Sequence, residues 1–464
     1  MFFRQFYDDR LAQASYLLGS SVTGQALVVD PRRDIDVYVA AAAEHDLSVV
    51  AVSETHVHAD FLSGARELAH ATGATLYLSG EGASDAGYVR DKGAKAHFLR
   101  DGEDIQLGDV RVRARHTPGH TPEHMCFAVF DGAAPADAML LLSGDCMFVG
   151  DLGRPDLLES ALGQAGAAQA GAHQMYVSLR NLLASLPDFV QIWPAHGAGS
   201  ACGRALGAVP STTLGYERRF SWWSTLLERG DEAGFVEALL QGQPDAASYF
   251  TTMKRLNRVG APLLGRLPQP PLLDAAGVAA HVRQGGSLVD TRARESFIRS
   301  HPRGAIHVPD GSSFSNWSAW FIPTDASVVL VANPRRVDDL VRGLVRVGID
   351  RIAGFVPESG AQELPQETLP QLDARAAREQ ISDQQAEALD IRSRSEYDAE
   401  HMKGSLHISA GKLLNATGSL PKDRPLILFC AQGERSVAAT SVLRARGFDN
   451  AVNLNGGFNA WRAN

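Results

Sequence analysis

Histidine and aspartate side chains that could hold a metal ion gather in the first half of the chain. His56, His58 and Asp60 alternate directly after an apolar segment that ends near Val52. In an extended segment such side chains share one face, because the side-chain period of a strand is two. Polar groups at the ends of apolar strands are what an α/β scaffold offers a metal, so this pattern predicts a metal site. Further candidates follow along the chain at His116, His120, His124, Asp145 and His196.

A second reactive group lies near the end of the chain. Cys430 follows the apolar segment 426–429 and opens a loop that leads, near Ser436, into a predicted helix. Loop amides and a helix N-terminus both stabilise an anion, so a thiolate at this point is a good nucleophile. Arg435 adds a positive charge. The spacing CxxxxR after a strand therefore indicates a catalytic cysteine, for sulfur transfer or for phosphatase-like chemistry.

Two proline-rich segments, 262–271 and 357–370, divide the chain. Proline removes a backbone donor and resists regular packing, so both segments are typical of linkers. They predict three domains, at residues 1–262, 272–360 and 375–464. The length of 464 residues agrees with this division at roughly 150 residues per domain.

The second and third segments look like tandem copies. Asp290 and Arg292 correspond to Asp390 and Arg392, and the same offset relates Phe297 to Tyr397, His301 to His401, Gly304 to Gly404 and His307 to His407. Each copy continues with an apolar strand, a loop and a helix, which predicts two α/β domains with parallel sheets. The middle copy has no cysteine where the last copy has Cys430. Measured back from Gly348 and Gly447, its loop is about two residues shorter. We therefore expect the middle copy to be catalytically inactive.

The first segment alternates between predicted strands and helices. Strands are expected at 26–30, 47–52, 110–114 and 126–130, and helices at 35–44 and 63–72. Many strands with a few helices predict a layered αββα arrangement. The fold class expected for the whole chain is therefore multidomain α/β.

Composition narrows the classes of partner. The formal net charge is -9, which argues against a broad nucleic-acid-binding surface. The longest apolar stretches, such as 138–142, fall far short of the ~20 residues that span a bilayer. The N-terminal segment carries Asp8, Asp9 and Arg10 where a signal peptide needs an apolar core. Four cysteines suit a reducing compartment. We expect a cytoplasmic protein with neither nucleic-acid nor membrane partners.

The motifs THVHADFLSG, HTPGHTPEH, LSGD and PAHG in the first segment resemble those of the metallo-β-lactamase superfamily. Members with two metals, such as glyoxalase II, carry a histidine where this chain has Phe61. A phenyl ring cannot bind a metal, so this departure argues for one metal rather than two. With GRPDLL added, the motifs most resemble those of persulfide dioxygenases.

This resemblance implies one Fe(II) per chain, bound by His56, His120 and Asp145. Two histidines and one carboxylate form the facial triad of non-haem iron enzymes, which leaves coordination positions for O2 and substrate. His58 is the alternative ligand. The resemblance further implies groups that orient ligands or water, and these are His58, Asp60 and His196. Candidate substrate contacts are Arg154, Tyr176 and Cys202, for which a structural role is the alternative.

The stretches at 390–397, 400–407 and 430–436 resemble a rhodanese domain. The resemblance favours sulfur transfer over phosphatase chemistry and implies that Cys430 carries sulfane sulfur beside Arg435. It further implies that Asp390 and Arg392 brace the domain and that Arg394 lines the pocket. The middle copy then corresponds to a rhodanese fold without its catalytic cysteine.

The whole chain resembles persulfide dioxygenase–sulfurtransferase fusions. The resemblance implies that a low-molecular-weight thiol persulfide is oxidised by O2 to sulfite and thiol. Cys430 would transfer sulfane sulfur between persulfide, sulfite and thiosulfate, in either direction, in sulfide detoxification. We expect a homo-oligomer. The alternatives are a glyoxalase-II-like zinc thioester hydrolase with an attached sulfurtransferase, and a persulfide-sensing binding protein.

Overall fold

The computed structural model describes residues 1–82, 87–88, 95–204 and 206–463. Their contacts define two units. The first comprises Met1–Ala246 and Phe250–Gly265, and the second comprises Ala247–Tyr249 and the chain from Arg266 onward. The boundary at Gly265 falls inside the first proline-rich segment. The second unit contains both copies, so the division into three domains stays a prediction.

Two six-stranded sheets form the middle of the first unit. The first sheet has its strands in chain order: β1 (Phe2–Asp8), β2 (Gln13–Gly19), β3 (Gln25–Val29), β4 (Ser48–Ser53), β5 (Thr75–Ser79) and β6 (Ala96–Leu99). The second sheet has the order β12 (Thr212–Thr213), β11 (Gln191–Pro194), β10 (Leu140–Gly144), β9 (Met125–Phe130), β8 (Val110–His116) and β7 (Asp104–Leu107). Strands β3 to β6 pair in parallel, so their carboxyl ends lie at one edge.

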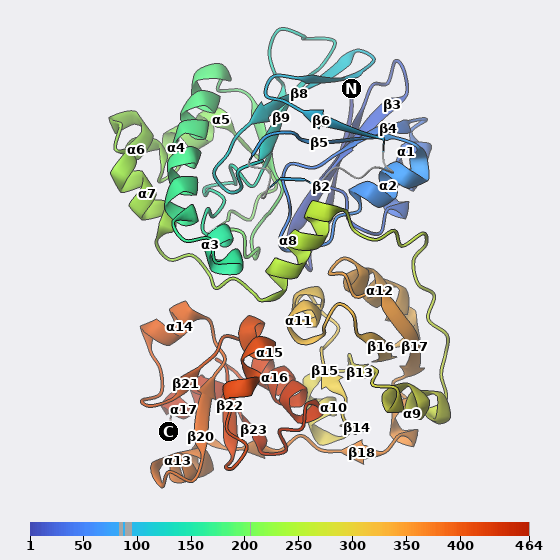
Figure 1. Cartoon of the computed structure of the whole chain (residues 1–464), viewed down its shortest axis with the longest axis vertical. Coiled ribbons are helices and arrows are strands. Elements are labelled where there is room, and N and C mark those ends of the chain that lie inside the picture. The colour runs from blue at the N-terminus through green and yellow to red at the C-terminus, as the bar shows by residue number, and fades with distance from the viewer. Residues whose placement is uncertain (83–86, 89–94, 205, 464) are drawn as a thin grey trace. The chain divides into compact units, whose positions relative to one another are not determined.

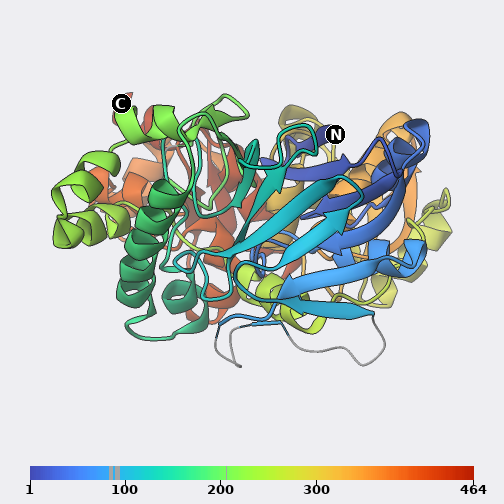
Figure 2. The same ribbon diagram turned by 90° about the horizontal axis from the view of Figure 1, so that it is seen from above.

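Helices cover the outer faces of both sheets, as the buried apolar clusters show. One cluster, which includes Leu27 and Phe127, fills the space between the sheets. A second packs the first sheet against α1 (Asp36–Glu44) and α2 (Ala65–Thr72). A third packs the second sheet against helices on the opposite side (Figures 1 and 2). The remaining helices are α3 (Leu157–Leu162), α4 (Ala167–Ser185), α5 (Leu214–Phe220), α6 (Ser224–Arg229), α7 (Glu232–Leu240) and α8 (Tyr249–Val259).

The αββα sandwich expected from the sequence is therefore confirmed. The predicted strands and helices of this segment are all present, and their ends differ from expectation by at most two residues. Among the described residues, no helix of the chain is both long and apolar enough to cross a membrane.

The second unit contains two parallel sheets and one short antiparallel pair, β14 (His301–Pro302) with β18 (Gln366–Glu367). The middle copy forms a four-stranded sheet in the order β15 (Ile306–His307), β13 (Ser287–Asp290), β16 (Ser327–Ala332) and β17 (Arg351–Pro357). The last copy forms a five-stranded sheet in the order β19 (Gln371–Leu372), β23 (Ala451–Leu454), β22 (Leu426–Phe429), β20 (Glu387–Asp390) and β21 (Leu406–His407). The helices are α9 (Ala275–Arg283), α10 (Arg294–Arg299), α11 (Phe314–Phe321), α12 (Val337–Val345), α13 (Ala374–Ser382), α14 (Arg394–Ala399), α15 (Leu413–Ala416), α16 (Glu434–Ala445) and α17 (Gly457–Ala463).

The register of the two sheets identifies the position equivalent to Cys430. Asp290 pairs with Val331 in the middle copy, as Asp390 pairs with Phe429 in the last copy. Ala332 therefore occupies the position of the cysteine. The expectation of a shorter middle loop is wrong, because α12 begins at Val337, no closer to its strand than α16 is to β22. A short 3-10 turn at Pro334–Arg336 occupies part of this loop.

Candidate metal and sulfur-transfer sites

Three of the predicted metal ligands come together at the strand ends of the first unit. His56 lies in the loop after β4, His120 in the connection between β8 and β9, and Asp145 directly after β10. One ligand atom from each lies within 4.8 Å of the others, and all three side chains are buried. Gly144 permits this approach, because its φ of +52° brings its backbone against His124 and Thr55. The fold thus gathers residues far apart in sequence into one cluster, here called the metal cluster.

Hydrogen bonds leave one nitrogen of each histidine available to a metal. His56 Nδ1 lies 3.0 Å from Thr55 Oγ1, which itself donates to Asp30. His120 Nδ1 lies 2.8 Å from the Arg154 carbonyl oxygen and donates to it. The Nε2 atoms of His56 and His120 then face Asp145 Oδ2 at 3.9 and 3.5 Å. Hydrogen bonding of the remote nitrogen is the usual way in which proteins orient a metal-binding imidazole.

The protonation states of these side chains suit a metal. Burial and the neighbouring histidines lower the pKa of His56, and burial lowers the pKa of His120 to about 4. Burial would raise the pKa of Asp145, but His196 and His120 outweigh it and hold that pKa well below its usual range. Metal ligands must be neutral imidazoles and ionised carboxylates. Asp145 Oδ2 is buried without a hydrogen-bond partner among the described residues, so the donor set fits a divalent cation.

His196 is held between two carboxylates rather than facing the metal cluster with a free nitrogen. Its Nδ1 lies 2.9 Å from Asp145 Oδ1, and its Nε2 lies 2.8 Å from Asp60 Oδ2. Burial opposes the charged form, but Asp145 and Asp60 raise the pKa of His196 well above its ordinary value. Both nitrogens of His196 are thus engaged by carboxylates, and the contact with Oδ1 orients Asp145.

His58 is likewise paired with acidic groups. Its Nε2 lies 3.0 Å from Asp30 and 3.2 Å from Glu54. Burial alone would lower the pKa of His58, but these two carboxylates raise it to about 10. Its ring also contacts the buried ring of Phe61, with centroids 4.5 Å apart. His58 thus groups with Asp30 and Glu54 rather than with the metal cluster, and its role as the alternative ligand stays a prediction.

The other histidines of the HTPGHTPEH motif have different partners. His124 Nε2 accepts the Asp145 backbone N–H at 3.0 Å, and its Nδ1 lies 2.8 Å from Thr117 Oγ1. His116 Nε2 donates to the Pro122 carbonyl oxygen at 2.8 Å. Only His120 of this motif therefore reaches the metal cluster.

A second group of potential ligands adjoins the first. Asp60, His196 and Cys202 are buried and place one ligand atom each within 4.8 Å of one another. Burial raises the pKa of Cys202 to about 12, so this thiol is protonated at neutral pH. The structure thus places Cys202 beside the metal cluster, in a form that is a weak nucleophile.

The remaining candidate substrate contacts are engaged with protein groups. The Arg154 guanidinium donates to both carboxylate oxygens of Asp156, at 2.8 and 2.7 Å, and to the Ala201 carbonyl oxygen. Tyr176 lies on α4 in the core of this side of the unit, and its ring packs against Phe235. The carbonyl oxygen of Arg154, rather than its guanidinium, acts directly on a predicted metal ligand.

Four charged residues of the site were missed by sequence reasoning. Asp30 and Glu54 directly follow β3 and β4, so the same strand-end rule that identified His56 could have identified them. Glu123 and Lys254 had no comparable signal. Glu123 stands inside a histidine-rich motif, and Lys254 lies on α8, far along the chain.

The candidate sulfur-transfer site is built on β22 and α16. Cys430 follows β22, and its Sγ accepts the Gly433 backbone N–H at 3.2 Å. The Ser436 hydroxyl lies 3.6 Å from the same sulfur. Gly433 has a φ of +94°, which glycine adopts without strain and which turns its N–H toward the sulfur. These donors favour an anionic sulfur at this position.

Arg435 is held beside the cysteine loop by Glu396. The guanidinium donates to both oxygens of this carboxylate, at 2.9 and 2.7 Å. Glu396 is fixed in turn, because it forms a capping box with Ser393 at the start of α14. Arg394 instead pairs with Asp398 at 2.9 Å on the exposed side of α14. Glu396 was missed by sequence reasoning, although the Ser-x-x-Glu spacing of a capping box from Ser393 to Glu396 is visible in the sequence.

The expected brace of this domain is present. Arg392 Nη2 donates to Asp390 at 2.6 Å and to the Glu400 carbonyl oxygen at 2.7 Å. The middle copy repeats the pair, since Arg292 donates to Asp290 at 2.6 Å. The shared ion pair supports a common origin of the two copies.

Comparisons with known proteins agree with this combination of fold and sites. The family model described as "Metallo-beta-lactamase superfamily" matches residues 8–196, and that described as "Rhodanese-like domain" matches residues 373–464. An αββα sandwich with a histidine–aspartate cluster, followed by a cysteine loop on a parallel sheet, defines a metal-binding protein with a sulfurtransferase-type domain. The chain belongs to the metallo-β-lactamase superfamily and carries a rhodanese-like domain at its C-terminal end.

Individual relatives extend this finding. The crystal structure of a metallo-beta-lactamase from Staphylococcus aureus subsp. aureus COL is 38% identical, with a TM-score of 0.67; the match covers 77% of this chain and 98% of that one. Persulfide dioxygenase ETHE1, mitochondrial, of Bos taurus is 28% identical over 42% of this chain and 67% of its own length. A hydroxyacylglutathione hydrolase-like protein of Gallus gallus is 31% identical over 39% of this chain and 56% of its own length. The relatives thus include both a dioxygenase and a hydrolase-like protein.

Proposed function

We propose that the first unit is a persulfide dioxygenase with one Fe(II) per chain, and that the rhodanese-like domain transfers sulfane sulfur. The observation that carries the proposal is the metal cluster of His56, His120 and Asp145. His58 and His196 are tied to carboxylates, and Phe61 provides no ligand atom, which supports a single metal with a two-histidine, one-carboxylate set.

The proposed reaction consumes a thiol persulfide, O2 and one water, and yields sulfite, the free thiol and protons. The terminal sulfur is oxidised, O2 is reduced, and the S–S bond breaks so that the thiol leaves. A bound Fe(II) would supply open coordination positions for O2 and for the persulfide sulfur. The protein's own part is to hold the ligands: Thr55 and Arg154 orient the two imidazoles, and His196 orients Asp145.

The rhodanese-like domain would act on the same intermediates. Cys430 takes sulfane sulfur from a second persulfide, and sulfite attacks the outer sulfur of the resulting cysteine persulfide. The S–S bond breaks, thiosulfate leaves and the Cys430 thiolate is restored. The Gly433 N–H and Arg435 favour the anionic sulfur at each stage. The reverse direction, from thiosulfate to persulfide, uses the same groups, and either direction serves sulfide detoxification.

Metal content and O2 consumption, measured together, test the proposal. Protein purified without oxygen should hold about one iron per chain and consume O2 when glutathione persulfide is added. Two zinc ions per chain without O2 uptake would refute it. Coenzyme A persulfide is supplied in parallel. O2 uptake with this persulfide alone would show that glutathione is the wrong carrier thiol, whereas no uptake with either would show that the reaction is wrong.

A second candidate function is a zinc-dependent thioester hydrolase. The observation in its favour is the adjoining group of Asp60, His196 and Cys202, which offers ligand atoms for a second metal beside the first. This candidate predicts cleavage of S-lactoylglutathione by the zinc-loaded protein. The absence of such cleavage, with persulfide-dependent O2 uptake in the same preparation, would exclude it.

A further inference from the structure

Lys254 is a buried lysine whose ammonium group has no direct partner. Its side chain is 5% exposed, and its Nζ forms neither a hydrogen bond nor an ion pair within 4.0 Å among the described residues. Lys254 lies on the buried face of α8, together with Phe250, Met253 and Asn257. An apolar side chain at this position would be buried at a lower cost in free energy. An unpaired buried charge is expensive, and such groups are concentrated at functional sites.

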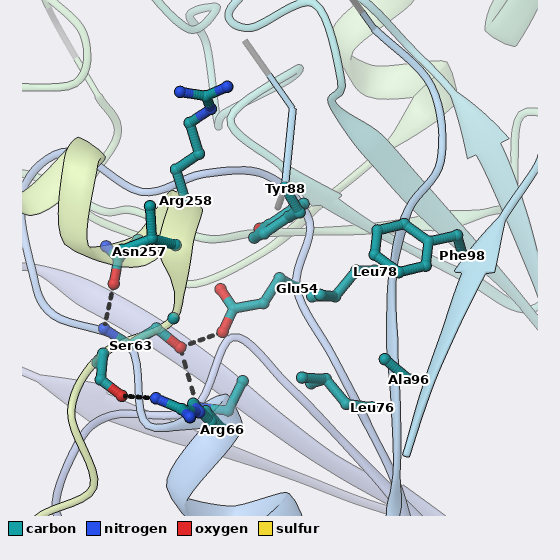
Figure 3. Close-up of a pocket in the computed structure, with 14 residues that line it drawn as sticks. Glu54, Ser63, Arg66, Leu76, Leu78, Tyr88, Ala96, Phe98, Asn257 and Arg258 are labelled. Atoms are coloured by element: carbon teal, nitrogen blue, oxygen red, sulfur yellow. Dashed lines mark hydrogen bonds between the residues drawn. The ribbon is translucent and has the colours of Figure 1, made fainter. Parts of the chain in front are cut away.

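Helix α8 is fixed to the loop that carries His56. The Asn257 side-chain amide donates to the carbonyl oxygens of His58 and Phe61, at 2.8 and 2.7 Å. Its oxygen accepts the Ser63 backbone N–H at 2.9 Å, a contact drawn in Figure 3. Lys254 precedes Asn257 by three residues, so both side chains lie on one face of the helix. The buried lysine is therefore on the side of α8 that faces the loop carrying His56.

The charges that act on Lys254 belong to the same region. Burial lowers the pKa of Lys254, while the carboxylates of Glu123 and Asp145 oppose this effect. Lys254 in turn contributes to the lowered pKa of His120. The ammonium group thus acts electrostatically on two predicted metal ligands from outside the ligand set.

Glu123 does not account for the lysine by direct pairing. Glu123 is buried; its Oε1 accepts the Val57 backbone N–H at 2.9 Å, and its Oε2 has no hydrogen-bond partner among the described residues. No ion pair joins this carboxylate to Lys254 within 4.0 Å. The three N–H donors of the lysine therefore remain available to an anion that enters the site.

We infer that Lys254 binds the anionic sulfur group of the substrate beside the metal cluster: first the terminal sulfur of the persulfide, then the oxygens of sulfite. This inference rests on the proposed function. A buried ammonium attracts a small anion strongly, because charge-assisted hydrogen bonds are stronger than neutral ones and the surroundings exclude water. Lys254 would thereby set the preference of the site for an ionised sulfur group over a neutral thioester.

Sulfite titration of the metal-loaded protein tests this role without turnover. Lys254→Met removes the charge and keeps the length of the side chain. Its dissociation constant for sulfite, measured by calorimetry, should be at least about tenfold higher than that of the unaltered protein. Arg255→Met is the matched control, because Arg255 is the exposed neighbour on the same helix, and its sulfite affinity should be unchanged. Any sulfite that binds near Cys430 contributes equally to the titration of every variant, so it does not affect the comparison.

Two further measurements keep the test decisive. Lys254→Met combined with Glu123→Gln removes both buried charges, and its metal content and melting temperature report whether the unit folds. Weak sulfite binding in this folded double variant supports the inference. Full recovery of sulfite binding would overturn it, because Lys254 would then only balance Glu123. Glutathione binding is measured in parallel. A loss of glutathione affinity with unchanged sulfite affinity would also overturn the inference, since the lysine would then bind a carboxylate of the carrier thiol.

Failure of the proposed function can be distinguished from failure of the inference about Lys254. Absence of O2 uptake by the unaltered, iron-loaded protein would refute the dioxygenase reaction. The sulfite comparison between Lys254→Met and Arg255→Met would still decide whether the buried lysine binds a sulfur anion.

Discussion

The Nδ1 atom of His196 lies 2.9 Å from Oδ1 of Asp145, and this contact determines which oxygen of the carboxylate faces the metal cluster. Oδ1 is occupied by the imidazolium, so Oδ2 is left toward His56 and His120. The opposite nitrogen of His196 is held by Asp60. The histidine of the PAHG motif thus contacts the metal cluster through the Asp145 carboxylate.

His196→Ala should therefore weaken metal binding without removing any ligand. Loss of a group that orients a metal ligand typically costs ten- to 100-fold in affinity, and a decrease of that order is expected here. Competition with a chromogenic chelator measures it. His173→Ala, which removes an exposed histidine on α4, is the control. Equal metal affinity in the two variants would show that Asp145 needs no such support.

Substitution of a proposed ligand should separate the two activities. His120→Ala removes one of three ligand atoms, so iron content and persulfide-dependent O2 uptake should both fall to background. Transfer of sulfur from thiosulfate to cyanide should persist, because Cys430 lies in the other unit. His116→Ala, in the same motif but hydrogen-bonded to Pro122, should retain iron. Loss of both activities in His120→Ala would contradict the two-site assignment.

Cys430→Ser should change the product rather than the oxidation. The metal cluster is untouched, so the rate of O2 uptake should stay near that of the unaltered protein. Sulfite should accumulate in place of thiosulfate, because no cysteine persulfide is available to it. Ion chromatography of the products, with O2 uptake recorded in the same sample, makes the comparison. An unchanged ratio of thiosulfate to sulfite would exclude Cys430 from the reaction.

The proximity of the three predicted ligands could be anticipated from the sequence because each follows, or lies beside, an apolar strand. Parallel pairing of β3 and β4 also places Asp30 and Glu54 beside His58, but their effect depends on register and burial, which no motif records. The orienting role expected of His58 stays a prediction, and the contacts with those two carboxylates are what the structure adds to it.

Other parts of the sites had no local signal. Lys254 lies on α8, which Asn257 fixes to the loop after β4, and the two segments are far apart in the chain. The length of the middle loop was misjudged because counting back from Gly348 takes the following helix to be equally long in both copies. In fact α12 has 9 residues and α16 has 12.

The pair of Glu396 and Arg435 should make the last domain sensitive to acid. Burial alone would raise the pKa of Glu396, but Arg435 and Ser393 lower it to about 2. A carboxylate whose pKa is lowered on folding stabilises the fold above its ordinary pKa of about 4.5, and this stability is lost as the pH falls toward 2. Glu396→Gln should thus cost about 1 kcal/mol at pH 7, a modest value because the pair is partly exposed. Urea unfolding of the two proteins should show a difference that shrinks below pH 4.5; a constant difference would contradict the ion-pair account.

A cysteine in the middle copy should not create a second sulfurtransferase. The sheet register identifies Ala332→Cys as the equivalent substitution, made in a Cys430→Ser background. The loop that follows it lacks the donors found near Cys430, because Pro334 has no N–H and the Arg335 N–H is bound by Asn333 Oδ1 at 3.0 Å. A thiolate there is left without the backbone contact that Gly433 gives to Cys430. Release of thiocyanate from thiosulfate and cyanide should stay at background, whereas turnover above it would mean that sheet position alone activates the cysteine.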